Sequence, residues 1–269
     1  MTDQPVLSLK EISKTFQKGT ANENHVLKAL SLDVNKGDFI TIIGGNGSGK
    51  STLLNSIAGN VLVDSGQINI NDDDVTKLKE ERRAGRVGRV FQDPLVGTAP
   101  RMTVGENLAI ALRRGQRRTL KFGSSAKEQD YFKSLLEPLG LGLENRLTAE
   151  MGLLSGGQRQ SITLLMATMK RPELLLLDEH TAALDPKTAE TILALTNQVV
   201  EQEQLPTLMI THNMQDALHY GNRMIMMNRG QVVVDVHGEE KAQLTVQDVM
   251  ELFQKATDGN QFSNELLLG

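Results

Sequence analysis

Short apolar runs alternate with stretches of helical periodicity along this 269-residue chain. Segments that read as short strands occupy residues 38–43, 86–91, 174–177 and 208–211. The run at 174–177 is uninterrupted and aliphatic, as is typical of a strand buried in a parallel sheet. The first run leads through a glycine-rich turn into residues 51–58, an apolar stretch that predicts a helix. The pattern therefore predicts an α/β fold, in which ligands bind beyond the carboxyl ends of the strands.

The rest of the pattern predicts an antiparallel β portion, a helical region and a polar tail. Strands are predicted at residues 6–9, 27–34 and 67–70, with a hairpin over 223–236 turned at Asn228-Arg229-Gly230. Helices are predicted at residues 104–114, 126–136 and 245–256. Within one domain spanning 1–269, we expect residues 95–150 to form a helical subdomain that extends into the helix after Ser155. We expect residues 257–269 to form a mobile tail.

The glycine-rich turn has the spacing of a phosphate-binding loop. Its candidate ligand-binding residues are Gly44, Asn46, Gly47, Ser48, Gly49, Lys50, Ser51 and Thr52. The glycines permit positive φ, so that backbone N–H groups turn inward and form an anion site at the helix N-terminus. In this pattern Lys50 reaches the β- and γ-phosphates, the Ser51 hydroxyl binds Mg²⁺, and Thr52 lies near the α-phosphate. A plain glycine-rich turn is the alternative, and the flanking strand and helix argue against it.

A second helix start occurs in the middle of the chain. Ser155 and Gln158 have the spacing of a capping box, in which each side chain binds a backbone N–H of the other residue. Gly156 and Gly157 stand between them. Glycine is costly in a first turn unless the backbone approaches something closely, and a nucleotide phosphate is one such group. Without the glycines, a purely structural cap would explain the pair equally well.

These two motifs resemble those of the ATP-binding cassette (ABC) family. Residues 44–52 match its Walker A motif, and residues 154–158 (Leu-Ser-Gly-Gly-Gln) match its signature motif. The resemblance implies a P-loop NTPase fold with a RecA-like core, an antiparallel β subdomain and an inserted helical subdomain. It also implies ATP as the substrate and Mg²⁺ as the cofactor.

The acids after the run at 174–177 resemble a Walker B motif. Asp178 would hold Mg²⁺ through water, and Glu179 would act as general base toward the attacking water. Helix capping is the alternative role for such an acidic pair. The resemblance further implies that Gln92 contacts Mg²⁺ and the water, that His212 senses the γ-phosphate, and that Asp185 belongs to the D-loop beside the nucleotide.

Phe16 is the candidate platform for the adenine ring. Only 3% of the residues are aromatic, and Phe16 lies upstream of the P-loop, where the family often has tyrosine. A place in the hydrophobic core is the alternative. The remaining histidines have no partner at the spacing of metal ligands, so we expect no transition-metal site.

The segment after Glu179 departs from the family pattern. It reads His180, Thr181, Ala182, where the family usually has Pro, Thr, Ser. We expect that His180 alters the charge beside the general base near neutral pH, and that Ala182 removes one contact across a dimer. The segment from Asp178 to Pro186 is similar to that of cassettes from bacterial importers of aromatic amino acids or related small solutes.

Composition limits the cellular compartment and the binding partners that we expect for the protein. The chain has no cysteine and a net charge of -4, which argue against disulfides and against non-specific nucleic-acid binding. It has no apolar run of membrane-spanning length, and Met1 to Lys10 lack the pattern of a secretion signal. We therefore expect the protein to be located in the cytosol. A basic run at Arg113, Arg114, Arg117, Arg118 and Lys121 would be a solvated helix end or a contact with lipid phosphates.

The expected function is that of an energy-coupling ATPase subunit of a membrane ABC transporter, importing a small solute such as an amino acid. The partners implied by the resemblance are a second copy of the chain, an integral membrane permease and, through the complex, an extracytoplasmic substrate-binding protein. This places the chain at the cytoplasmic face of the membrane. The alternatives are a soluble ABC ATPase of an assembly or ribosome-associated system and a nucleotide-binding regulator that does not hydrolyse ATP.

Overall fold

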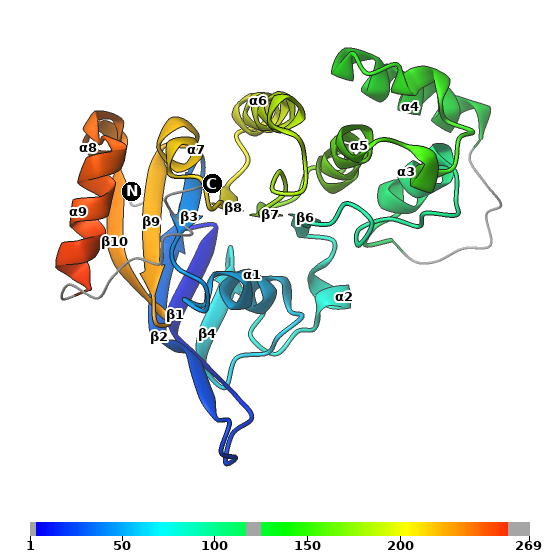
Figure 1. Ribbon diagram of the computed structural model, residues 1–269. Helices are drawn as coiled ribbons and strands as arrows, with labels where there is room; N and C mark the ends of the chain where they lie inside the picture. Colours follow the sequence, from blue (N-terminus) through cyan, green and yellow to red (C-terminus); the bar gives the residue numbers. More distant parts are fainter. Residues whose placement is uncertain (1–3, 117–124, 258–269) are drawn as a thin grey trace. The chain divides into compact units, whose positions relative to one another are not determined.

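The computed structural model describes residues 4–116 and 125–257, and the chain divides into two compact units (Figure 1). The first unit holds the chain up to Arg83 and from Gln204 onward, and the second holds residues 84–203. Arg117, Arg118 and Lys121 of the basic run lie outside the described residues, as does the predicted tail from residue 258.

The antiparallel portion predicted near the N-terminus is confirmed. Four strands of the first unit form a sheet in the order β2-β1-β4-β5: β1 (Leu7–Phe16), β2 (Asn24–Val34), β4 (Ser65–Ile70) and β5 (Asp73–Asp74). All three neighbouring pairs are antiparallel. β1 and β2 extend beyond the predicted apolar segments because their ladder continues through polar pairs to Phe16 opposite Asn24.

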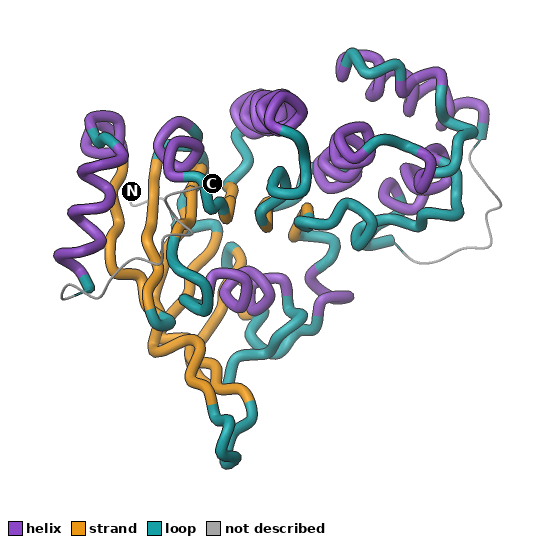
Figure 2. The backbone as a smooth tube through the Cα atoms, viewed as in Figure 1, coloured by secondary structure: helices purple, strands orange, loops and turns teal. Residues whose placement is uncertain are grey.

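A second sheet of the first unit carries the P-loop. It contains β3 (Phe39–Ile43), β8 (Thr207–Ile210), β9 (Arg223–Asn228) and β10 (Gln231–His237), and Figure 2 shows the strands in orange. β3 pairs in parallel with β8 and β9, while β9 and β10 form the predicted antiparallel hairpin. Because β3 and β8 run in parallel, the residues that follow them emerge at the same edge.

The first unit also contains the helices α1 (Lys50–Ala58), α2 (Glu80–Arg83), α7 (Met214–His219), α8 (Gly238–Gln243) and α9 (Val246–Ala256). Of these, α7, α8 and α9 contact this sheet. The predicted C-terminal helix is confirmed by α9, whose buried Val249 and Phe253 join a cluster with Met224 and Met226 of β9. Thr257, where the predicted tail begins, is buried and donates its hydroxyl to the Phe253 carbonyl at 2.8 Å.

The second unit combines two parallel strands with a set of helices. β6 (Val87–Val90) and β7 (Leu174–Asp178) pair in parallel, and α6 (Pro186–Glu203) follows β7. The helices predicted near residues 104 and 126 are confirmed by α3 (Val104–Leu112) and α4 (Ala126–Leu136). The helix α5 (Gly156–Thr168) follows three short 3-10 turns, η1 (Glu137–Leu139), η2 (Leu143–Asn145) and η3 (Met151–Leu153).

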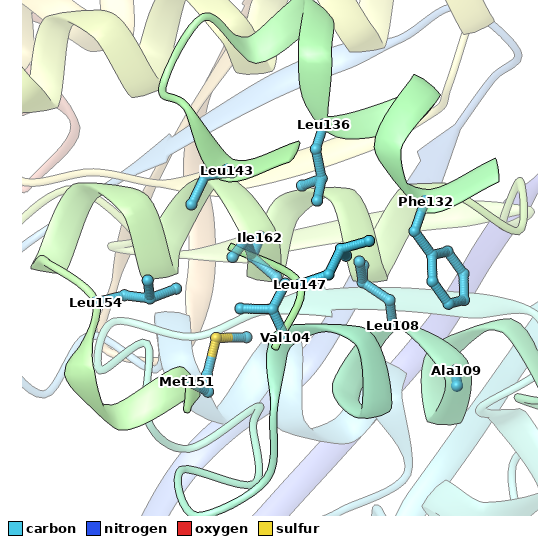
Figure 3. Packing of buried hydrophobic residues seen from close by; sticks show 10 residues of the cluster. All are labelled: Val104, Leu108, Ala109, Phe132, Leu136, Leu143, Leu147, Met151, Leu154 and Ile162. Atoms are coloured by element: carbon cyan, nitrogen blue, oxygen red, sulfur yellow. The ribbon is translucent and has the colours of Figure 1, made fainter. Parts of the chain in front are cut away.

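One apolar cluster joins α3, α4 and α5 (Figure 3). Phe132 of α4, Leu108 of α3 and Ile162 of α5 are fully buried in it. Leu154, the first residue of the signature motif, is buried in the same cluster. The start of α5 is therefore fixed to this helical core through an apolar anchor directly before Ser155.

Two arginines of the basic run serve this unit internally. Arg113 pairs with Glu128 at 3.0 Å, and Arg114 donates to the carbonyl of Ala167 at 2.9 Å. Neither side chain is fully solvated, because both donate to acceptors of neighbouring helices.

Candidate functional site

The loop between β3 and α1 has the backbone that its glycines predicted. Gly44, Gly47 and Gly49 have φ of 154°, 75° and 105°, in the region that glycine favours. A Cβ on Gly44 would lie 2.3 Å from the Met227 carbonyl oxygen, and one on Gly49 would lie 2.9 Å from that of Val26. The loop is therefore pressed against neighbouring backbone at both ends, and only glycine fits there.

Lys50 closes the loop from inside. Its ammonium donates to the carbonyl oxygens of Gly44 at 2.7 Å and Gly45 at 3.3 Å, and the side chain is buried. The hydroxyl oxygen of Ser48 is also buried and has no hydrogen-bond partner among the described residues. A buried donor without a partner costs free energy unless a ligand supplies the acceptor. With the N-terminus of α1 at the same place, these donors fit a phosphate group.

The other Walker A residues lie in more open positions. Asn46, Gly47 and Ser51 are exposed, and Thr52 is partly exposed. The hydroxyl of Ser51, in the first turn of α1, is thus accessible to a metal ion or a phosphate.

His212 lies at the same edge of the sheet as the P-loop. β3 ends at Ile43 and β8 at Ile210, and the two strands are paired in parallel. Thr211 continues that pairing through a hydrogen bond to Ile42 O at 3.2 Å, so His212 follows directly after the ladder. The Asn213 side chain then caps α7. The strand order therefore brings His212 and the P-loop to one edge of the first unit.

Phe16 ends β1 and is 38% exposed, so its alternative assignment to the core is wrong. The ammonium of Lys14 lies 5.5 Å from the centre of the ring. An exposed aromatic face beside a cation is available for stacking on a purine.

The acidic pair and Gln92 share an edge of the second unit. Asp178 is the last residue of β7, and Gln92 follows β6, its parallel neighbour. Glu179 has φ of 48°, a left-handed conformation that a non-glycine residue rarely adopts. This turn directs the chain away from the strand immediately after Asp178. The two candidate catalytic residues, Gln92 and Glu179, therefore both follow strand ends.

Asp178 has a partner that the sequence did not indicate. The Arg89 guanidinium lies 3.2 Å from one Asp178 carboxylate oxygen, and both side chains are largely buried. Gln160 of α5 is fully buried and donates its side-chain amide to the carbonyl of Phe91 at 3.2 Å. The only sequence signal for either residue was its polarity within an otherwise apolar strand or helix face.

The predicted capping box at the start of α5 is confirmed. The Ser155 hydroxyl accepts from the Gln158 N–H, and the Gln158 side chain accepts from the Ser155 N–H, each at 3.3 Å. The two glycines between them have close neighbours in the same unit. A Cβ on Gly157 would lie 2.3 Å from the Thr188 methyl carbon, and one on Gly156 would lie 3.2 Å from Leu184. Packing against the start of α6 is thus a second reason for glycine at these positions.

Asp185 stands directly before α6. Its carboxylate accepts from the Thr188 N–H at 3.1 Å, and hydrogen bonds from Thr188 hold the pKa of Asp185 below its usual value. The side chain is exposed and ionised at neutral pH.

The expectation for His180 was wrong. The ring is 1% exposed, and burial lowers the pKa of His180 to about 4, so it is neutral near pH 7. Its Nε2 lies 3.1 Å from the Thr196 hydroxyl, whose own proton is donated to the Ile192 carbonyl. Nε2 therefore carries the proton and donates to Thr196. His180 fixes the turn after Glu179 to α6 and adds no charge beside the general base.

Sequence comparison identifies the protein family to which these sites belong. The profile of the ABC transporter family matches residues 27–182. The tyrosine transport ATP-binding protein of Clostridioides difficile (strain R20291) is 46% identical over 93% of this chain and 100% of that protein. The chain belongs to the ABC transporter family, and it is an ATP-hydrolysing subunit of such a transporter.

Other relatives are longer. The spermidine/putrescine import protein PotA of Vibrio cholerae is 34% identical over 86% of this chain, which spans 57% of PotA. The methionine import protein MetN of Rhizobium etli is 36% identical, with 86% of this chain covering 60% of MetN.

Solved structures agree with the fold. The ADP conformation of MJ1267, an ATP-binding cassette of an ABC transporter, has a TM-score of 0.75 and 30% identity, covering 93% of this chain and 98% of that one. A dimeric post-hydrolysis state of the cassette MJ0796 bound to ADP and Pi has a TM-score of 0.74 and 28% identity, covering 86% and 98%. The P-loop NTPase fold expected from the sequence is confirmed.

Proposed function

We propose that this chain powers the uptake of an aromatic amino acid through a membrane permease, working as a pair of identical subunits at the cytoplasmic face of the membrane. The observation that carries the ATPase part is the P-loop, where Lys50 and the buried Ser48 hydroxyl converge on the N-terminus of α1. The named relative that transports tyrosine supports the substrate class. Among the described residues, no helix is long and apolar enough to cross a bilayer.

The chain's residues divide the work on ATP. Lys50 has three N–H donors, so it can bind phosphate oxygens while keeping a bond to the loop. Glu179 takes a proton from the attacking water, a role that contributes about 10²–10⁴-fold in rate. Gln92 orients that water, and His212 donates to the γ-phosphate. Phe16 stacks on the adenine.

Mg²⁺ fits the donors that the chain offers. The Ser51 hydroxyl, the Asp178 carboxylate and the Gln92 amide are hard oxygen groups of the kind that this ion prefers. When bound, Mg²⁺ supplies charge neutralisation for the β- and γ-phosphate oxygens.

The signature residues would act on the nucleotide of the second copy. Ser155, Gly156, Gly157 and Gln158 open α5, and the N-terminus of this helix is a second site suited to an anion in the same chain. The dimeric cassette MJ0796 supports a pair of such subunits. We further propose that residues 95–150 form a helical subdomain, that the permease docks beside Gln92, and that a substrate-binding protein joins the complex.

The test is recovery of partners with a trapped dimer. Glu179→Gln keeps the shape of the side chain but removes the base, so ATP should remain bound and the pair closed. Tagged Glu179→Gln protein, with ATP and Mg²⁺, should recover a polytopic membrane protein from gently solubilised membranes of its own host. Lys50→Ala is the matched control and should recover less, because it cannot hold ATP.

Uptake assays in the same host test the proposed solute. Cells lacking the chain should lose uptake of labelled tyrosine, phenylalanine or tryptophan, and wild-type protein but not Glu179→Gln should restore it. Recovery of soluble assembly or ribosomal proteins alone would refute the transporter assignment. Recovery of a permease without any change in aromatic uptake would refute the substrate class only.

A further inference from the structure

Arg89 and Asp178 form an ion pair between neighbouring strands. The guanidinium nitrogen Nη2 lies 3.2 Å from the Asp178 Oδ2, and the side chains are 11% and 17% exposed. Arg89 pairs with Leu176 in the parallel register, so its side chain reaches forward along β6 to the end of β7. The contact therefore holds one oxygen of the Walker B aspartate at the edge where ligands bind.

Arg89 is itself held from the other side. Its guanidinium lies 4.4 Å from the centre of the ring of Phe91, the residue directly after β6. A guanidinium stacked on an aromatic ring is restricted in orientation as well as in place. The position of the Asp178 partner is therefore defined by packing and not by charge alone.

The strand β6 and Phe91 also contact α5, the helix that begins at the signature motif. Gln160, fully buried in α5, donates to the Phe91 carbonyl at 3.2 Å. β6 also packs tightly on α5, because a Cβ on Gly88 would lie 2.7 Å from the Ala167 carbonyl oxygen. A continuous set of contacts thus runs from Asp178 through Arg89 and Phe91 to α5, one residue before Gln92.

We infer that Arg89 is a positioning residue: it fixes the Asp178 carboxylate so that its second oxygen faces the Mg²⁺ of the bound nucleotide. This inference rests on the proposed function. A carboxylate at the end of a strand rotates about its side-chain bonds, and each alternative orientation reduces the fraction of time in which it can bind the ion. Partners that orient metal-binding carboxylates are typically worth about 10–100-fold in metal affinity or activity.

A second ion pair on the same strands provides a matched control. The Arg86 Nε lies 2.9 Å from a Glu173 carboxylate oxygen, and the side chains are 27% and 33% exposed. Both residues directly precede their strands, β6 and β7, and so lie at the other end of the strands from Asp178. If Arg89 merely tied two strands together, substitution of either arginine would have similar consequences. The ion pair of Arg89 is to a proposed metal-binding residue, whereas that of Arg86 is to Glu173.

The experiment measures nucleotide binding with and without the ion. Titration calorimetry with the non-hydrolysable β,γ-imido analogue of ATP, in EDTA and in Mg²⁺, gives the factor by which the ion tightens binding. In Arg89→Met we expect this factor to fall about tenfold, with the affinity in EDTA unchanged because the P-loop is untouched. Arg89→Lys keeps the charge but loses the planar fork, so most of the loss should remain. Arg86→Met should behave as wild type.

The outcomes separate this inference from the proposed function. Binding in Mg²⁺ that is as tight in Arg89→Met as in wild type, or tighter, would overturn it, because a guanidinium that only competed with the ion would give that result. An equal loss in EDTA would show a general structural role and would also overturn it. If the wild-type protein binds no nucleotide, the proposed function fails and the inference falls with it.

Discussion

At the scale of single residues, burial distinguishes the charged side chains that can bind a ligand from those that only stabilise the fold. Arg83 follows an acidic pair in a polar stretch that would ordinarily be solvated, yet its side chain is fully buried. It donates to the carbonyl oxygens of Ser56 and Ile57 at 2.8 Å each and to that of Leu78 at 2.8 Å. Burial lowers the pKa of Arg83 to about 10, so it stays charged at neutral pH. It closes the C-terminal end of α1, where a positive charge is favourable.

Replacing this arginine should be costly. Arg83→Met leaves buried carbonyl oxygens without donors, and we expect the free energy of unfolding to fall by about 3–5 kcal/mol. Urea denaturation followed by circular dichroism measures the change. Arg82→Met, at the exposed neighbouring position, should change stability by less than about 0.5 kcal/mol. Similar values for the two variants would show that the carbonyl contacts of Arg83 contribute little.

Local residue chemistry predicted the loop but not the environment of single side chains. The glycines at 44, 47 and 49 could be assigned because positive φ is a property of the residue itself. His180 could not, because burial in the folded protein lowers its pKa and its hydrogen-bond partner Thr196 lies 16 positions away in the sequence. Arg89 was missed for the same reason, since its partner lies 89 positions away in the sequence.

At the scale of elements, close packing fixes where α5 begins. Gly157 lies in its first turn, and Thr188 lies in the first turn of α6. The two positions are so close that a methyl group on Gly157 would overlap the Thr188 methyl. The signature glycine therefore has a packing role that is separable from any contact with nucleotide.

A double substitution separates these roles. Gly157→Ala should lower the free energy of unfolding by about 1–3 kcal/mol through overpacking, although alanine favours helix. Thr188→Ser removes the opposing methyl, so the double variant should regain most of that stability. If ATPase activity returns as well, the glycine serves packing alone. If stability returns while activity stays low, the backbone at Gly157 also meets the nucleotide. Additive losses would refute the clash.

Elements were predicted well where the apolar pattern was uninterrupted. β3, β7 and β8 lie within one residue of the predicted runs because β3 and β8 are buried throughout and β7 is buried up to Asp178. β1 was predicted too short, since its far end is polar and is held by backbone pairing with β2, which leaves no apolar signal. Pairing partners and their register are long-range properties that a single strand does not encode.

At the scale of the whole molecule, the site residues fall into two sets. The first unit holds the P-loop and His212, and the second holds Gln92, the acidic pair and the signature motif. Order along the chain allowed these sets to be identified, because the family motifs are read from the sequence. Which copy of the chain completes each nucleotide site is a separate question, which mixing of inactive variants answers.

Complementation between two inactive variants tests the shared site. Ser155→Arg blocks the signature helix, and Lys50→Ala disables the P-loop, so each variant alone should hydrolyse almost no ATP. In a mixed dimer, one site would combine an intact P-loop with an intact signature motif from the other copy. We therefore expect mixing to restore activity, up to about a quarter of the wild-type rate for random pairing. No recovery, with mixed dimers detected by native mass spectrometry, would contradict the arrangement.

The bonds from Lys50 to its own loop bear on how such lysine variants are interpreted. The ammonium spans the turn between Gly44 and Gly45 and the start of α1, so it acts as an internal brace before any ligand arrives. A loop that already has its ligand-binding conformation loses little conformational entropy when a ligand binds. Removal of the lysine therefore takes away two things at once, a charge for the phosphates and the stiffness of the cradle. The affinity lost in Lys50→Ala is the sum of both, and it overstates the electrostatic attraction between lysine and ATP.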